Sequence, residues 1–249
     1  MDLMESLRAR AAADPQRVTF FEGDNPKMMR VVGELSSARL AKCCLVGEDE
    51  ALHRVAEEVG VDLGGIEVVD VCNEEANEAF ACRFEQVPGC PWKPKAIRRH
   101  AKRPMDRAFM MQRADETDVA FGGIDCSTGD VITAGQTIVG LADGVDVISS
   151  LGICNIPGWE GPEGSLLGFG DAAVCIDPNP EQLASIAIAS AETVRALLGR
   201  EPRVAMLSYS TDGSAESELV EGVREAVGLA RERRPDLKID GEFQLDAAI

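Results

Sequence analysis

Short, uniformly apolar segments alternate with amphipathic helical segments over the first seventy residues. The runs at residues 18–21, 43–46 and 66–71 are mostly apolar and lack the regular apolar–polar alternation of a strand with one face in water. Strands that are apolar on both faces are typical of parallel sheets covered by helices on each side. The segments at residues 26–40 and 53–59 carry apolar side chains at helical spacing. This order predicts an α/β fold with a mostly parallel sheet.

The pattern extends the same architecture toward the middle of the chain. Residues 3–13 have helical spacing, and residues 73–113 are polar and mostly helical, with a loop at 88–91. A further strand is predicted at residues 119–121, followed by a Gly-Gly turn and a helix at 130–141. The first domain is therefore expected to comprise residues 1–145.

A second domain is expected over residues 146–249, because domains commonly contain roughly 100–200 residues. Its predicted strands are residues 147–151 and 172–175, separated by an irregular stretch rich in Gly and Pro at 157–170. A long helix should follow, with Asn179 as N-cap, Pro180 in its first turn and Gly199 just past its end.

One turn in this domain contains an unusual density of hydroxyls. In VAMLSYSTDGSA, residues 204–207 read as a buried strand, and a helix is expected from Ala215 to Arg234, with Leu219 and Val220 among the residues that face inward. The hydroxyls between them occupy a strand-to-helix turn, where ligands commonly bind in parallel sheets. The same residue types also cap helices, and both interpretations remain open.

Charge limits the classes of partner. The chain has 43 acidic and 25 basic residues and a net charge of -18, which disfavours nucleic acid and membrane surfaces as partners. The one strongly basic stretch, residues 93–103, could attract an anionic substrate, or form a solvated helix face or a dimer contact. The N-terminus lacks the apolar stretch of a signal peptide, which predicts a cytoplasmic location.

The eight cysteines do not form a metal motif. There is no CxxC pair, and neither His53 nor His100 stands at ligand spacing from a cysteine. Cys43, Cys44 and Cys175 lie in apolar runs, so reduced, buried thiols and no metal site are expected.

Three stretches resemble the phosphate acetyltransferase (phosphotransacetylase) family and its phosphate butyryltransferase relatives. They are VAMLSYSTDGSA, the preceding DPNPEQLASIAIASAETV and the following RPDLKIDGEFQLDAA, with FFEGDNPKMMR similar to the family's first loop. The resemblance implies two α/β/α lobes with mostly parallel sheets, of the isocitrate/isopropylmalate dehydrogenase-like fold, and a homodimer. It also implies reversible acyl transfer between coenzyme A (CoA) and phosphate, through acetyl phosphate, without a metal or other cofactor.

The resemblance carries over to individual positions. Lys27 stands where the family has an arginine near a CoA phosphate, and Arg83 matches a family arginine at the phosphate site, although a surface arginine is an equal alternative. Ser127 and Thr128 match a hydroxyl-rich loop that contacts CoA, with the next acid, Asp130, expected to cap a helix. Thr133 replaces a family arginine, which removes a cation from the anion site.

The sequence ends at Ile249, before a family segment that supplies a serine, an arginine and an aspartate for catalysis, so catalytic residues stay unassigned. The chain is expected to be a fragment of a longer enzyme or a naturally short homologue. A non-catalytic CoA or acyl-phosphate binding protein and a butyryl-preferring relative are the alternatives.

Overall fold

A computed structural model describes residues 3–90, 92–161 and 164–249. The chain divides into two units, Met1–Gly140 and Leu141–Ile249, and each is described by itself. None of the helices in these described ranges is long and apolar enough to cross a membrane.

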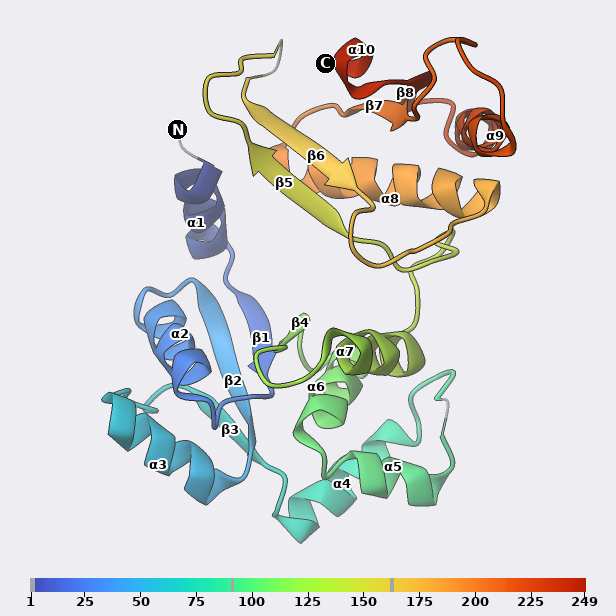
Figure 1. The fold of residues 1–249 in the computed structure, drawn as a ribbon. Coiled ribbons are helices and arrows are strands. Elements are labelled where there is room, and N and C mark those ends of the chain that lie inside the picture. The colour runs from blue at the N-terminus through green and yellow to red at the C-terminus, as the bar shows by residue number, and fades with distance from the viewer. Residues whose placement is uncertain (1–2, 91, 162–163) are drawn as a thin grey trace. The chain divides into compact units, whose positions relative to one another are not determined.

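A four-stranded parallel sheet forms the centre of the first unit (Figure 1). Its strands are β1 (Gln16–Phe20), β2 (Ala41–Gly47), β3 (Glu67–Asp70) and β4 (Val119–Phe121). Their order in the sheet is β3-β2-β1-β4, and every neighbouring pair is parallel. The predicted mixed α/β fold with a mostly parallel sheet is confirmed.

Helices pack on both faces of this sheet. The alternating burial of β2 shows the two faces, because Cys43 and Leu45 pack in one apolar cluster while Cys44 and Val46 pack in another. The unit's helices are α1 (Leu3–Ala13), α2 (Pro26–Ser37), α3 (Asp49–Val59), α4 (Glu74–Phe84), α5 (Pro94–His100), α6 (Pro104–Arg113) and α7 (Thr128–Ala134), which continues as the π-turn η1 (Gly135–Val139).

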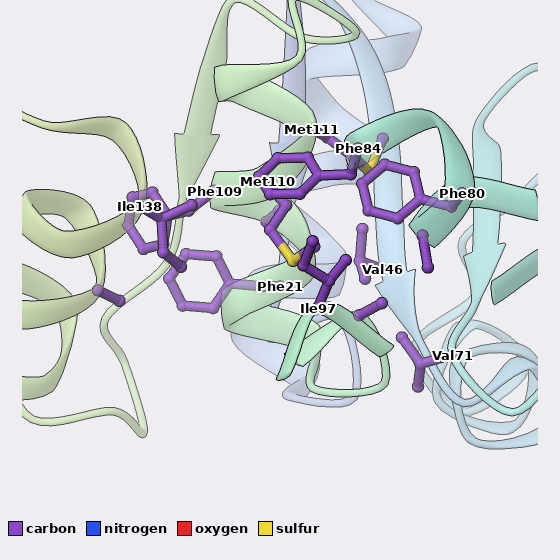
Figure 2. Close-up of a cluster of buried hydrophobic side chains, with 14 of the residues drawn as sticks. Phe21, Val46, Val71, Phe80, Phe84, Ile97, Phe109, Met110, Met111 and Ile138 are labelled. Atoms are coloured by element: carbon purple, nitrogen blue, oxygen red, sulfur yellow. The ribbon is translucent and has the colours of Figure 1, made fainter. Parts of the chain in front are cut away.

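Large side chains fill the cluster on the face covered by α4, α5 and α6. Phe80, Phe84, Ile97 and Met110 are fully buried there, and Phe109 contacts the ring of Phe21, at a centroid distance of 5.8 Å (Figure 2). The rings tie the helices to the end of β1, so this core fixes the loops that follow the sheet.

Arg113, the last residue of α6, joins two loops to this core. Its Nη1 donates to the backbone oxygens of Ile138 (2.8 Å) and Val139 (3.2 Å) in η1. Its Nη2 donates to the oxygens of Pro88 (2.9 Å) and Gly89 (2.6 Å). The far end of the α7–η1 segment is thereby fixed.

The described residues of the second unit form two separate strand pairs. β5 (Leu151–Asn155) and β6 (Leu166–Gly170) are antiparallel, whereas β7 (Arg203–Leu207) and β8 (Lys238–Phe243) are parallel (Figure 1). Its helices are α8 (Pro180–Leu198), α9 (Glu218–Arg233) and the short α10 (Leu245–Ala248).

Alanines let α8 and α9 pack closely. Ala184, Ala187 and Ala191 of α8 share a buried cluster with Ala226 and Ala230 of α9. The predicted ends of α8 are confirmed: Asn179 accepts from the Gln182 N–H in a capping box, Pro180 lies in the first turn, and Gly199 is left-handed at φ 64°.

Two predicted strands of this unit are wrong. The strand expected at residues 147–151 begins only at Leu151, and residues 166–170, expected to be irregular, form its antiparallel partner. The strand expected at 172–175 is a bend, because the Asp171 carboxylate accepts the N–H groups of Ala173 (3.0 Å), Val174 (3.3 Å) and Cys175. The N–H groups of these residues are thereby taken up by a side chain.

Two helix predictions also need correction. The helix expected at Ala215 begins at Glu218, after its N-cap Ser217, and Leu219 is 72% exposed although it was expected to face inward. Asp130 does not cap the helix expected at 130–141, because α7 begins earlier, with Ser127 as its N-cap.

Candidate functional site

The carboxyl ends of β1 and β4 bring two of the predicted loops together. β1 pairs directly with β4, and the pairing is extended by the Phe21 N–H, which donates to the Phe121 oxygen at 3.3 Å. The FFEGDNP loop and the GGIDCST loop therefore leave the sheet side by side. In open parallel sheets this edge is the usual place for ligands.

Glu22 connects the two loops. Its Oε2 accepts backbone N–H bonds from Gly123 (2.6 Å) and Ile124 (2.7 Å). Its Oε1 accepts from Asp125 (2.9 Å) and Cys126 (2.8 Å). With 4% of its surface exposed, Glu22 satisfies four consecutive amides of a segment that lies a hundred residues away in the sequence.

The charge state of Glu22 follows from these bonds. Burial by itself raises the pKa of a carboxyl group, but the four N–H donors outweigh it and lower the pKa of Glu22 to about 2. Glu22 is therefore an anion at neutral pH.

Two glycines make this approach possible. A Cβ on Gly122 would lie 2.2 Å from the Phe21 ring, so no larger residue fits against that side chain. Gly123 has a φ of 110°, a conformation that L side chains rarely adopt. Together they let the backbone turn its amides toward Glu22.

Asn25 joins the start of α2, which carries Lys27, to the GGIDCST loop. Its Nδ2 donates to Asp125 Oδ2 at 2.8 Å, while its Oδ1 caps α2 by accepting the Lys27 N–H at 2.9 Å. Lys27 lies in the first turn of α2, is exposed, and makes no ion pair within the described ranges.

The hydroxyl residues of α7 have different roles. Ser127 is the N-cap: its Oγ accepts the Asp130 N–H at 3.1 Å and donates to Asp130 Oδ2 at 2.6 Å. Thr128 follows in the first turn and is exposed, and Thr133 is exposed near the end of the helix. The structure thus brings Ser127 and Thr128 to the edge that also carries Lys27.

The hydroxyl turn of the second unit is held together internally. Ser210 is fully buried, and its Oγ donates to Glu242 Oε1 at 2.9 Å and accepts the Ala215 N–H at 3.0 Å. Tyr209 donates its hydroxyl hydrogen to Ser217 Oγ at 2.6 Å. Of the two interpretations, neither helix capping nor an open ligand site describes Ser210: its hydroxyl ties the turn to β8 through Glu242, while Ser217 is the N-cap of α9.

Glu242 anchors that turn from β8. Its oxygens accept from Arg224 Nε (2.8 Å) and Nη2 (2.9 Å), and from the Gly213 N–H (2.9 Å), besides Ser210. The Arg224 guanidinium is the main cause that holds the pKa of Glu242 well below its usual range.

Comparisons with known proteins show the family of the whole chain. Residues 2–249 match the profile described as "Phosphate acetyl/butaryl transferase". The chain belongs to this phosphate acetyl/butyryl transferase family. It is 36% identical to the phosphate acetyltransferase of Clostridium acetobutylicum over 252 residues, which cover all of this chain and 75% of that relative.

A second relative and a solved structure agree. The phosphate acetyltransferase of Thermoanaerobacterium thermosaccharolyticum is 35% identical and is covered to 76%, with all of this chain aligned. The structure of the EutD phosphotransacetylase from Staphylococcus aureus matches with a TM-score of 0.85 and 27% identity, covering all of this chain and 74% of that one.

Arg83, the position that resembles a family phosphate contact, lies apart from the other predicted residues. It is in the last turn of α4, and its Nη2 pairs with Glu116 Oε1 at 3.1 Å. Glu116 precedes β4, so this pair lies toward the amino end of the strand, whereas Lys27 and Ser127 follow the carboxyl ends of β1 and β4.

The basic stretch at residues 93–103 is largely neutralised within the first unit. Arg98 pairs with Glu78 (2.6 Å) and Glu85 (2.5 Å), and Lys102 pairs with Glu74 (2.6 Å). These contacts favour a helix face that binds neighbouring acids over a strongly positive surface.

A hollow of about 660 Å³ in the second unit is also unsuited to phosphate groups. It is lined by apolar side chains such as Leu207 and Leu219 and by the acids Asp177, Glu218, Glu221 and Glu225, with no Lys or Arg among the described lining residues. Carboxylates at this density would repel an anionic substrate.

The cysteines are free thiols. Cys43 and Cys44 are buried as expected. Cys175 is only partly buried, and Cys72, Cys82 and Cys154 are exposed, so the expectation of buried thiols is wrong for these four. The described ranges contain no group of three or more His, Cys, Asp or Glu side chains arranged to hold a metal ion.

The two anchoring carboxylates, Glu22 and Glu242, are not among the residues predicted from the sequence. Glu22 follows an apolar run, in FFEG, whereas Glu242 follows Asp-Gly, in DGEFQ, and in both cases the donors come from distant segments. The only local signal for Glu22 is a charged residue between a buried strand and a glycine.

Proposed function

We propose that this chain takes part in reversible acyl transfer between CoA and inorganic phosphate, with acetyl as the acyl group. The observation that carries this proposal is the family match over residues 2–249, together with 36% identity to a phosphate acetyltransferase. In one direction the CoA sulfur attacks the acyl carbon of acetyl phosphate. A C–S bond forms, the C–O bond to phosphate breaks, phosphate leaves with the electron pair, and the thiol proton passes to a base.

The carboxyl edge of the first unit is the proposed contact for CoA. The exposed Lys27 offers a cation for a CoA phosphate, and Thr128 offers an exposed hydroxyl beside the N-cap Ser127. In a protein of net charge -18, an exposed cation such as Lys27 strongly affects where an anion binds.

The other two proposed substrate contacts have weaker support. Thr133 lies on the same helix as Ser127 and can only donate or accept a neutral hydrogen bond. Arg83 is available to phosphate only if its guanidinium leaves Glu116, since these two side chains are paired.

Several broader features are proposed with this function. They are two α/β/α lobes of the isocitrate/isopropylmalate dehydrogenase-like fold, a homodimer, a cytoplasmic location, and chemistry that uses CoA as a substrate and needs no metal or other resident cofactor.

An assay of thioester formation from CoA and acyl phosphate tests the reaction. Turnover should be measurable with acetyl phosphate and lower with butyryl phosphate. Higher turnover with butyryl phosphate would change the acyl preference, and failure of both would overturn the acyltransferase proposal.

Charge reversal tests the CoA contact. Lys27→Glu should raise the KM for CoA roughly tenfold, because a charge-assisted contact is replaced by repulsion. Lys42→Glu is the matched control, since Lys42 is exposed at the amino end of β2 and changes the net charge equally. Equal effects of both variants would show that only the overall field matters.

A further inference from the structure

The loop that leads into α7 takes its shape from a side chain of another segment. Four consecutive N–H groups, those of Gly123 to Cys126, converge on the Glu22 carboxylate at 2.6–2.9 Å. Converging backbone amides form concave sites for anions. Here the concave site is already occupied by an anion of the protein itself, the Glu22 carboxylate.

We propose that Glu22 is a positioning residue for CoA binding: it is the internal anion that fixes the loop presenting Ser127 and Thr128. This inference rests on the proposed function. The amide of Cys126 is held directly, the next residue caps α7, and Thr128 occupies the first turn, so the hydroxyls lie one and two residues beyond a fixed point.

A glutamate suits this role better than its closest substitutes. Four N–H donors need two acceptor oxygens, each of which takes two bonds here. A glutamine would offer one oxygen and turn an NH₂ group toward two of the donors, while an aspartate is shorter by one methylene.

The same loops also determine where the proposed cation lies. Asn25 joins Asp125, inside the amide segment, to the Lys27 N–H. Glu22, three residues before Asn25, thus fixes the hydroxyls and Lys27 relative to each other.

The carboxylate of Glu22 limits where the phosphate groups of the substrate can bind. The Glu22 carboxylate would repel a phosphate from these four amides, so they are excluded as a phosphate site. The phosphate groups of CoA must instead bind elsewhere, and Lys27 is the proposed cation for one of them.

Hydrogen exchange and steady-state kinetics test the role together. In Glu22→Gln, exchange at the amides of residues 123–126 should accelerate at least about tenfold. The KM for CoA should rise roughly ten- to hundred-fold, with a smaller change in kcat, because a misplaced contact weakens binding of the substrate it positions. Glu22→Asp should give an intermediate KM.

Thr117→Val is the matched structural control. Thr117 is buried beside the amino end of β4, and its Oγ1 donates to the Arg17 oxygen at 2.8 Å. The variant loses a buried hydrogen bond of the same unit without touching the loop, so it should leave the KM for CoA unchanged.

The outcomes are distinguishable. Unchanged exchange in Glu22→Gln, or the same rise in KM in Thr117→Val, would overturn the positioning role while the acyltransferase proposal stands. A wild-type chain with protected amides but neither CoA binding nor turnover would overturn both proposals. If Glu22→Gln does not fold, Asp125→Ala, which removes only the Asn25 contact, should raise the KM for CoA severalfold, and an unchanged KM would count against the role.

Discussion

Both units bury a glutamate at the carboxyl end of a parallel strand pair, but they neutralise it differently. Glu22 accepts hydrogen bonds from four backbone amides, whereas Glu242 is bound by the Arg224 guanidinium, the Ser210 hydroxyl and one amide. Glu22 joins the loops that follow β1 and β4, whereas Glu242 joins β8 to the turn that follows β7.

The difference shows what each site depends on. Apart from proline, no substitution in the loop removes a backbone N–H, so the site around Glu22 depends on the glutamate and on the glycines that shape the loop. The site around Glu242 depends on side chains from α9 and the hydroxyl turn, and so can be weakened at several positions.

The largest effect is expected when the backbone-bound carboxylate is removed. Glu22→Ala leaves four N–H groups without their acceptor, and it should lower the free energy of unfolding by about 4 kcal/mol, because each unsatisfied buried donor costs roughly 1–3 kcal/mol and water offsets part of this. Urea unfolding at neutral pH measures the loss. Asp24→Asn is the control, since that exposed carboxylate of the same loop should change stability by less than about 0.5 kcal/mol.

Lowering the pH should reduce the stability of the wild-type protein through the same carboxylate, Glu22. The pKa of Glu22 drops from 4.5 to about 2 on folding, so its ionised form stabilises the fold above pH 4.5, and this contribution is lost as the pH falls toward 2. The loss amounts to about 3 kcal/mol. Unfolding free energies measured between these pH values should fall less steeply in Glu22→Gln, and parallel curves would contradict the assignment.

A smaller effect is expected from the side-chain-bound site. Ser210→Ala removes a buried hydroxyl that donates to Glu242 and accepts the Ala215 N–H, which should cost about 2 kcal/mol. The same urea experiment measures it. The loss should add to that of Glu22→Ala in the double variant, since each site lies within its own unit; strong non-additivity would show that the sites interact.

The smallest effects are expected at the hydroxyls of α7. Ser127→Ala removes an N-cap and should cost about 1 kcal/mol, while Thr128→Ala should cost less than about 0.5 kcal/mol because its side chain is exposed. Thermal unfolding distinguishes the two. If Thr128→Ala were the more damaging variant, its hydroxyl would have a structural role instead of the proposed contact with CoA.

Much of the first unit could be predicted from the sequence because its strands are apolar on both faces. The side chains of residues 43–46 (CCLV) pack alternately into two apolar clusters, as expected for a strand of a parallel sheet that is covered by helices on both faces. The second unit was harder, because β6 (LLGFG) is short and glycine-rich, and because Asp171 turns the apolar residues 172–175 into a bend.

The candidate site was predictable only in part. Family resemblance pointed to Lys27, Ser127 and Thr128, and the structure brings these residues to one edge. The sequence could not reveal that the Glu22 carboxylate binds the four amides of residues 123–126. These donors lie a hundred residues away, and no local sequence pattern predicts which backbone N–H groups a carboxylate will bind. The ion pair that holds Arg83 also depends on a distant partner, Glu116.

The Arg113 contacts give the α7–η1 segment a second fixed end. Glu22 accepts hydrogen bonds from the amides just before the segment, and Arg113 donates to the carbonyl oxygens of Ile138 and Val139 at its far end. Because one end of this segment is bound by an anion and the other by a cation, an inserted or deleted residue between them would break one of the two sets of hydrogen bonds. Relatives that keep both side chains should therefore vary in composition between these two anchors but not in length.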